Sequence, residues 1–392
     1  MTKTKLLEKN IRNYAIILIT NKRTYMTFLT IVLLTMPNTT AKTIGLFMLI
    51  GSIVGFIFEI PSGYISDRLG HRNTIILSRF MFCVSTLCYL LANNVIWFFV
   101  GSIFLELGFA FFSGTGSAFM HETLQALKKD HLYSKIMGRI RSLGFAVPII
   151  FILLLPVVAE KSFRYAFAIA LAIDIVGFLV SLRLVNPNKK TKVKEIGITN
   201  MTKVVRSWAQ VGWAPYVLFS LFASGFAFGA VAGFKNPFQE SLGFSISMLG
   251  VLWASSRVLI SILLLFNGLI YKIFSHKNFI LMKTFIFICS FLLIGLTGDK
   301  WLVALGFILL TTFTNGLSSA SSHYNLNYID KSQDKATLLS VNALIHKILS
   351  GLVGLGMGVL VFNFNYSISY LFIATATALI FIIGIIYIPR KN

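Results

Sequence analysis

The chain has 392 residues, of which 56% are hydrophobic and 12% charged, and its formal net charge is +22. Soluble domains contain about a quarter charged residues, so this composition excludes a soluble enzyme and a disordered protein. Three cysteines are too few for a disulfide-stabilised secreted domain, and a nucleic-acid-binding protein of this basicity would carry far more charge. Both properties agree with a polytopic membrane protein whose basic residues flank its spans.

Apolar runs long enough to cross a membrane recur along the whole sequence. A hydrocarbon core about 30 Å thick requires roughly 20 helical residues. Twelve such runs are predicted, at residues 11–37, 43–65, 73–93, 95–122, 138–159, 164–185, 213–234, 246–269, 278–298, 301–327, 337–362 and 366–389. Because the runs are long and lack the alternation of β-barrel strands, they predict an all-α membrane protein.

The longest polar segment divides these runs six and six. We expect an N-terminal six-helix bundle at 1–185, a cytoplasmic linker at 186–212 and a C-terminal six-helix bundle at 213–392. The basic residues predict the orientation: five of the 35 Lys and Arg fall on the outer side and four inside spans, which leaves 26 for the inner side. We therefore expect both termini in the cytoplasm. The expected location is a bacterial inner membrane.

A glycine- and charge-rich loop follows the second run. It reads Gly63-Tyr-Ile-Ser-Asp67-Arg68-Leu-Gly70-His71-Arg72, and a weaker copy that begins at Gly268 follows 205 residues later, between the eighth and ninth runs. Such an internal repeat is typical of transporters built from two pseudo-symmetric halves.

The physical chemistry of this loop predicts a conformational latch. Gly63 and Gly70 allow a tight turn and close helix approach. Arg68 and Arg72 can pair with a carboxylate such as Glu122, which would hold one conformation closed on the inner side. Ordinary positive-inside charge is the alternative interpretation. The predicted latch residues are Glu59, Gly63, Asp67, Arg68, Gly70, Arg72 and Glu122.

The loop resembles the signature Gly-x-x-x-Asp-Arg-x-Gly-x-Arg that joins helices 2 and 3 in the major facilitator superfamily. The stretch from Ala110 to Leu124 resembles helix 4 of the drug-efflux-like branch of that family, and Tyr133 to Arg139 resembles the start of helix 5. The resemblance implies twelve transmembrane helices in two pseudo-symmetric six-helix bundles that rock around a central site. It also implies proton-coupled efflux.

Charged side chains inside the spans are candidate functional groups, because each costs about 2.5–3.5 kcal/mol at a bilayer centre. Their positive excess predicts a cavity that binds an anion. The predicted substrate-binding residues are Lys22, Arg23, Arg257, His346 and Lys347. Internal ion pairing, for example of Glu106 with Lys22 or Arg23, is the alternative. Because Lys22 and Arg23 are adjacent, they cannot both face a cavity, and Asp174 in the sixth run is expected to be structural.

Glu106 and His323 are the predicted proton-coupling groups. Together these features predict a secondary transporter, not an enzyme, that exports a small organic compound such as a drug, a metabolite or a carboxylate siderophore. The positive charge in the spans makes an anionic compound a candidate. Proton-coupled uptake of an organic anion and a flippase for a lipid-linked substrate are the alternatives. We expect a monomer in the lipid bilayer that uses protons and its small-molecule substrate, without cofactor, metal or nucleic acid.

Overall fold

A computed structural model describes residues 3–187, 214–326 and 332–387. Within these ranges the chain is helical and contains no strand. It divides into two compact units, Met1–Pro37 with Ile53–Glu195 and Asn38–Ser52 with Ile196–Asn392, which we call unit 1 and unit 2 and describe separately. The predicted linker 186–212 lies outside the described residues, apart from Asn186 and Pro187.

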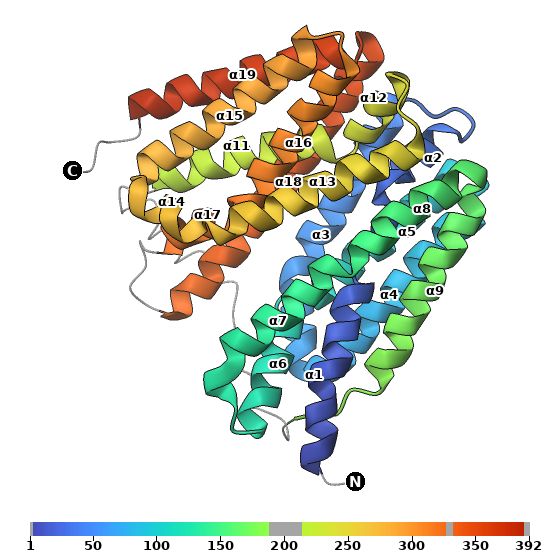
Figure 1. The fold of residues 1–392 in the computed structure, drawn as a ribbon, viewed down its shortest axis with the longest axis vertical. Coiled ribbons are helices and arrows are strands. Elements are labelled where there is room, and N and C mark those ends of the chain that lie inside the picture. The colour runs from blue at the N-terminus through green and yellow to red at the C-terminus, as the bar shows by residue number, and fades with distance from the viewer. Residues whose placement is uncertain (1–2, 188–213, 327–331, 388–392) are drawn as a thin grey trace. The chain divides into compact units, whose positions relative to one another are not determined.

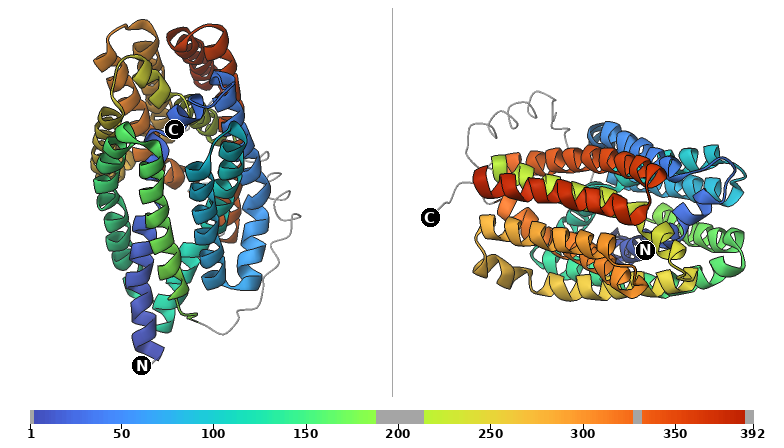
Figure 2. Two further views of the ribbon diagram at one scale, coloured as in Figure 1. Left: turned by 90° about the vertical axis from the view of Figure 1, so that its right-hand side faces the viewer. Right: turned by 90° about the horizontal axis from the view of Figure 1, so that it is seen from above.

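Unit 1 is a helical bundle (Figure 1). Its elements are α1 (Lys3–Thr20), η1 (Thr24–Thr27), α2 (Leu29–Leu34), the second part of α3 (Ala41–Leu69), α4 (His71–Leu91), α5 (Val95–Phe112), α6 (Thr115–Ala126), η2 (Asp130–Leu132), α7 (Tyr133–Ala146), α8 (Pro148–Lys161) and α9 (Phe163–Leu182). α4 packs against α5 and α9, and α1 packs against α7 and α9. Figure 2 shows α1, in dark blue, beside the green α9. A buried cluster that includes Tyr14, Ile17, Phe119 and Leu124 fixes α1 to α6.

Unit 2 has a corresponding arrangement. Its elements are the first part of α3, α11 (Ala214–Ala232), α12 (Lys235–Ser241), α13 (Ile246–Leu265), α14 (Asn267–Ile273), α15 (His276–Leu296), α16 (Lys300–Gly316), α17 (Ser318–Leu326), α18 (Ser332–Asn363) and α19 (Tyr366–Tyr387). α15 packs between α16 and α19, and α11 packs along α18. The last contact is close because Gly229 has no side chain: a Cβ there would meet the Ser350 carbonyl oxygen at 2.6 Å.

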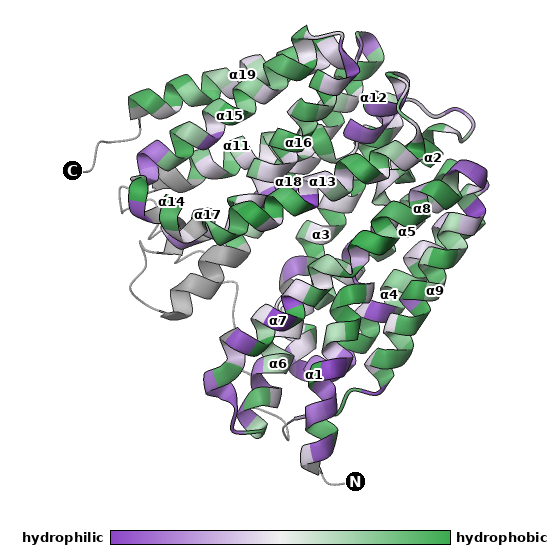
Figure 3. Ribbon diagram, in the orientation of Figure 1, coloured by the Kyte–Doolittle hydropathy of each residue, from purple (hydrophilic) through white to green (hydrophobic). Residues whose placement is uncertain are grey.

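The helices agree with the predicted membrane spans. Among the described residues, ten helices are long and apolar enough to cross a membrane, and the pair α11–α12, bent by 46°, is an eleventh candidate. Figure 3 shows apolar residues along these helices and polar residues concentrated toward helix ends, as in α6 and α7. The one remaining predicted span, 11–37 at the start of the chain, is broken: α1 ends at Thr20, a 3-10 turn follows, and α2 begins at Leu29.

The repeat found in the sequence is present in the helices. α3 and α13 begin 205 residues apart, at Ala41 and Ile246. α4 and α15 begin at His71 and His276, also 205 residues apart, and each has 21 residues. α4 and α15 are therefore counterparts, and their buried residues can be compared position by position.

Candidate functional site

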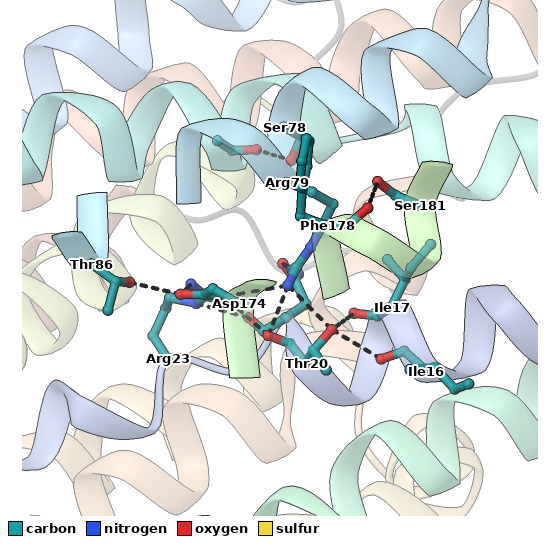
Figure 4. Close-up of polar contacts among 12 residues, drawn as sticks. Ile16, Ile17, Thr20, Arg23, Ser78, Arg79, Thr86, Asp174, Phe178 and Ser181 are labelled. Atoms are coloured by element: carbon teal, nitrogen blue, oxygen red, sulfur yellow. Dashed lines mark hydrogen bonds and ion pairs between the residues drawn. The ribbon is translucent and has the colours of Figure 1, made fainter. Parts of the chain in front are cut away.

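A buried ion-pair cluster holds the break in the first span (Figure 4). Arg23 Nη2 lies 2.7 Å from Asp174 Oδ1 on α9, and Arg79 Nη2 on α4 lies 3.4 Å from the same oxygen. Thr86, also on α4, donates a hydrogen bond of 2.7 Å to Asp174 Oδ2. Desolvated charges are stable only when they are paired and hydrogen-bonded, which this arrangement provides.

The same two guanidinium groups bind the free backbone carbonyls at the end of α1. Arg23 Nη2 donates to the Thr20 carbonyl oxygen at 2.7 Å, and Arg79 Nη2 donates to it at 3.2 Å. Arg79 Nη1 also donates to Asn21 Oδ1 at 3.1 Å. Helix ends leave carbonyl groups without intrahelical partners, and such groups need donors inside a membrane. The cluster therefore makes a broken helix possible in the interior of unit 1.

The two adjacent basic residues at the break have different surroundings. Arg23 is only 6% exposed and is held by Asp174. The Nζ atom of Lys22 lies 4.1 Å from the centre of the Phe145 ring on α7. Internal ion pairing, the alternative interpretation, holds for Arg23, but its partner is Asp174 and not Glu106. Glu106 is half-buried on α5, where its charge acts on the hydroxyl of Tyr89. Lys22 and Glu106 are thus the candidates that unit 1 retains.

Two buried basic residues were missed from the sequence, because both were counted among the basic residues at the inner ends of spans. Arg79 is the ninth residue of α4 and is fully buried. Lys283 is the eighth residue of α15 and is 3% exposed. Eight residues of helix extend about 12 Å, which is far enough to bring either side chain inside its unit. The repeat contained a usable signal, because these residues occupy neighbouring positions in counterpart helices.

The signature loop connects three helices of unit 1 through His71. Its Nδ1 lies 2.9 Å from Ser66 Oγ on α3, and its Nε2 lies 3.3 Å from Glu122 Oε1 on α6. Thr115 of α6 donates a hydrogen bond of 3.1 Å to Ser66 Oγ. If Ser66 accepts from Thr115 and donates to Nδ1, the proton of a neutral His71 lies on Nε2 and points to Glu122. The network therefore needs no charged imidazole.

The two arginines of the loop do not pair with Glu122, so that prediction is wrong. Arg72 donates to backbone carbonyl oxygens at the end of α9, to Leu184 at 2.5 Å and to Leu182 at 3.0 Å. Arg68 is exposed and lies over the Tyr64 ring, 4.7 Å from its centre.

The remaining latch residues have separate positions. Gly70 has a φ of +82°, as a tight turn before α4 requires. Gly63 lies within α3, where a Cβ would meet nothing within 4 Å, so it forms no turn. Glu59 accepts a hydrogen bond of 3.3 Å from Ser113, and Asp67 is exposed.

In unit 2, Arg257 of α13 is half-buried and has no carboxylate partner among the described residues. Its guanidinium lies over the Trp253 ring, 4.8 Å from the centre, and its Nε atom is buried without a hydrogen bond. Lys235 of α12 lies close enough for its charge to act on Arg257. Two basic groups thus lie together where no acidic side chain is described beside them.

A second basic group of unit 2 lies between α11, α15 and α17. Lys283 Nζ donates hydrogen bonds to Ser224 Oγ at 2.8 Å and to Ser321 Oγ at 3.4 Å. The ring of His346 on α18 lies edge-on to Phe228, 5.5 Å between centres, and it lies close enough for the charge of Lys283 to act on it. His346 and its neighbour Lys347 are half-buried, and His323 is exposed in the last turn of α17.

Comparison with known proteins identifies the family to which this architecture belongs. The model of the family described as Major Facilitator Superfamily matches residues 15–354. No curated protein matches the sequence. Among solved structures, a mutant of the nucleoside transporter NupG has a TM-score of 0.85 at 12% identity and covers 98% of this chain and 100% of its own.

Two further solved structures have the same fold at similarly low identity. A POT family transporter in complex with 5-aminolevulinic acid has a TM-score of 0.73 at 13% identity, with coverage of 97% and 96%. An inward-facing bacterial homolog of the human lysosomal transporter Spinster has a TM-score of 0.71 at 13% identity, with coverage of 99% and 97%. The matched family model and the shared fold show that the chain belongs to the major facilitator superfamily and is a multi-pass membrane transporter rather than an enzyme.

Proposed function

We propose that this chain is a proton-coupled exporter of a small organic anion, with both termini in the cytoplasm of a bacterial cell. Arg257 is the observation that carries the substrate class. In unit 1 the buried arginines share the carboxylate of Asp174, whereas no carboxylate lies within ion-pair distance of Arg257 in the described part of the chain. The Nε of Arg257 is also buried without a hydrogen bond, as is that of Arg79.

The acidic side chains described in unit 2 are committed elsewhere or lie apart from Arg257. Asp299 caps α16 by accepting hydrogen bonds of 2.9 Å from the backbone of Trp301 and Leu302. Glu240 is exposed at the end of α12, where its charge acts on Tyr366. A guanidinium keeps its charge in proteins and binds carboxylates through two parallel hydrogen bonds. A transported carboxylate supplies the missing partner of Arg257.

The other predicted substrate residues enter the proposal according to their surroundings. Lys235 adds positive charge beside Arg257, and His346 and Lys347 on α18 are half-buried in the same unit. Lys22 is the candidate in unit 1. Arg23 is left out because Asp174 and two backbone carbonyls already bind its guanidinium.

Trp253 makes the anion site measurable, since an anion on Arg257 changes the surroundings of this indole ring. The full chain in lipid nanodiscs is titrated with citrate, succinate and benzoate and with their neutral methyl esters while tryptophan fluorescence is recorded. We expect a saturable change with an acid and none with its ester. Arg257→Gln weakens binding about ten- to hundredfold, because a hydrogen bond to a charged group contributes about 1.5–3 kcal/mol.

Lys300→Gln is the matched control, because Lys300 also lies near a tryptophan ring, Trp301, at 5.8 Å. This variant should bind like the unchanged protein. Equal binding of acids and esters, or an Arg257→Gln variant with unchanged affinity, would contradict the anion site.

The direction and the coupling are tested with the acid that binds. Inside-out vesicles with an acidic interior should accumulate it, as export in exchange for protons requires. Accumulation by right-side-out vesicles under an inward proton gradient would instead establish uptake. Glu106→Gln should abolish gradient-driven flux and leave exchange of the anion intact, and His323→Gln tests the second predicted coupling group in the same assay.

A further inference from the structure

Lys283 is a buried cation without an acidic partner. It is 3% exposed, and it donates hydrogen bonds to two hydroxyl groups, Ser224 Oγ at 2.8 Å and Ser321 Oγ at 3.4 Å. No carboxylate in the described part of the chain lies within ion-pair distance of its Nζ. Hydroxyl dipoles compensate much less of a charge than a carboxylate does.

The counterpart helix in unit 1, α4, also has a buried basic residue at the neighbouring position, but this residue is paired with an acid. Arg79 of α4 is paired with Asp174 of α9. The helices α9 and α19 are also counterparts, since α19 packs along α15 as α9 packs along α4, but α19 contains no acidic residue. An arginine keeps its proton in proteins, whereas a buried lysine can release it. The permanent charge of Arg79 thus has a counter-ion, whereas the removable charge of Lys283 has none among the described residues.

Among the side chains that the structure describes, the charged and titratable groups around Lys283 do not include an acid. α11 and α19 contain no Asp, Glu, Lys, Arg or His residue, and α16 contains only Lys300, at its first position. α17 contributes His323, and α15 itself carries His276 and Lys277 in its first turn.

The remaining neighbour is α18. Its described side chains contribute His346 and Lys347, and His346 lies close enough for the charge of Lys283 to act on it. The neighbours named here are therefore all basic.

The surroundings of Lys283 admit a proton more readily than an organic anion. The ammonium group is almost inaccessible, but the groups in front of it are not: Ser224, Ser321 and His346 are each half-buried and so partly exposed. Ser224 Oγ donates to the Ser220 carbonyl oxygen at 2.6 Å, so it accepts from Lys283. His346 lies close to Ser224 and to Lys283. The buried amine thus contacts two partly exposed hydroxyl groups, and a partly exposed imidazole lies near them.

We propose that Lys283 is a reversible proton-binding site of unit 2, loaded and unloaded through Ser224, Ser321 and His346. Its role in driving transport rests on the proton-coupled cycle proposed above. The proton binds the neutral amine to form an ammonium ion, and its release restores the amine, so no other reactant is needed. The site differs from Glu106 and His323, because it lies on a helix that the sequence did not mark as functional.

The proton itself is the probe in the first test. The full chain is labelled with [15Nζ]lysine, placed in nanodiscs and followed by 15N NMR from pH 6 to pH 11, with the Lys283 signal identified by its loss in Lys283→Met. Solvated lysines titrate near pH 10.4. We expect Lys283 to titrate with a midpoint more than about one pH unit below the exposed lysines. A signal that stays protonated together with theirs overturns the proposal.

Two variants give a second, independent reading by thermal unfolding at pH 8. Lys283→Met should unfold at the same or a higher temperature than the unchanged protein, and Lys283→Arg at a lower one, because arginine cannot release its charge. The opposite order shows a permanent structural cation and overturns the proposal. Neither measurement needs a substrate, so its outcome is independent of the anion assay on Arg257.

Discussion

Arg23 and Asp174 form an ion pair of 2.7 Å in which the two side chains are only 4% and 2% exposed. Arg79 shares the same carboxylate, so the cluster holds two guanidinium groups and one acid. Both guanidinium groups also donate to the Thr20 carbonyl oxygen where α1 ends, and Arg23 Nε donates to the Asn21 carbonyl oxygen. The Arg23–Asp174 pair therefore both compensates buried charge and stabilises a helix end inside unit 1, and it fixes the backbone next to Lys22.

Asp174→Asn should destabilise the protein strongly. The substitution leaves two buried guanidinium groups without an anion, which costs about 3–5 kcal/mol for a broken buried pair. Glu8→Gln is the control, because the Glu8–Lys129 pair has a similar length, 3.0 Å, but side chains 49% and 43% exposed, and such pairs contribute about 0–1 kcal/mol. Thermal unfolding of the purified variants measures both. Similar losses for the two variants would contradict a structural role for the cluster.

Gly177→Ala tests the packing of the same cluster. A Cβ at Gly177 on α9 would collide with the Arg79 guanidinium and the Thr20 hydroxyl, so the ion pair must shift and the unfolding temperature should fall. Gly138→Ala is the matched change on α7, where a Cβ would meet nothing within 4 Å. In a helix that substitution should stabilise by about 0.5–1 kcal/mol. A Gly177→Ala variant as stable as Gly138→Ala would show that Arg79 is not confined by α9.

The sequence was sufficient for most of the helices, but not for the break in the run 11–37 or for the partners of the charged residues. Span length, positive-inside charge and the 205-residue repeat report on a helix by itself, and they predicted the helix starts at His71 and His276 to within a few residues. Which acid lies beside Arg23 depends on the packing of α1 against α9, over 151 residues of sequence, and no local pattern contains it. Arg79 and Lys283 were missed for the same reason: near a span end, burial depends on neighbouring helices.

Arg72→Ala should cost more stability than Arg68→Ala, although both arginines belong to the signature loop. Arg72 satisfies two carbonyl oxygens at the end of α9, of Leu182 and Leu184, and a hydrogen bond from a charged group contributes about 1.5–3 kcal/mol. Arg68 is exposed over Tyr64, so its loss should stay within about 0.5 kcal/mol. Chemical denaturation in mild detergent compares the two variants. Equal losses would mean that the bonds of Arg72 to α9 do not hold that helix end.

Asp67→Asn separates the stability of the loop from its predicted role as a latch. Asp67 is exposed in α3, so the free energy of unfolding should change by less than about 0.5 kcal/mol. Glu122→Gln is the control for stability, because Glu122 pairs with His71 at 3.3 Å and its loss should lower the unfolding temperature slightly.

For transport the expected order is reversed: Asp67→Asn should change turnover more than Glu122→Gln does. If Asp67 holds one conformation of the cycle, losing about 1.4 kcal/mol of that interaction changes turnover about tenfold in Asp67→Asn. Exchange of the acid identified with Trp253 fluorescence, measured in proteoliposomes, gives the rate. An Asp67→Asn variant that is as stable and as fast as the unchanged protein would leave the loop as ordinary positive-inside charge, because an exposed carboxylate that affects neither quantity cannot be part of a latch.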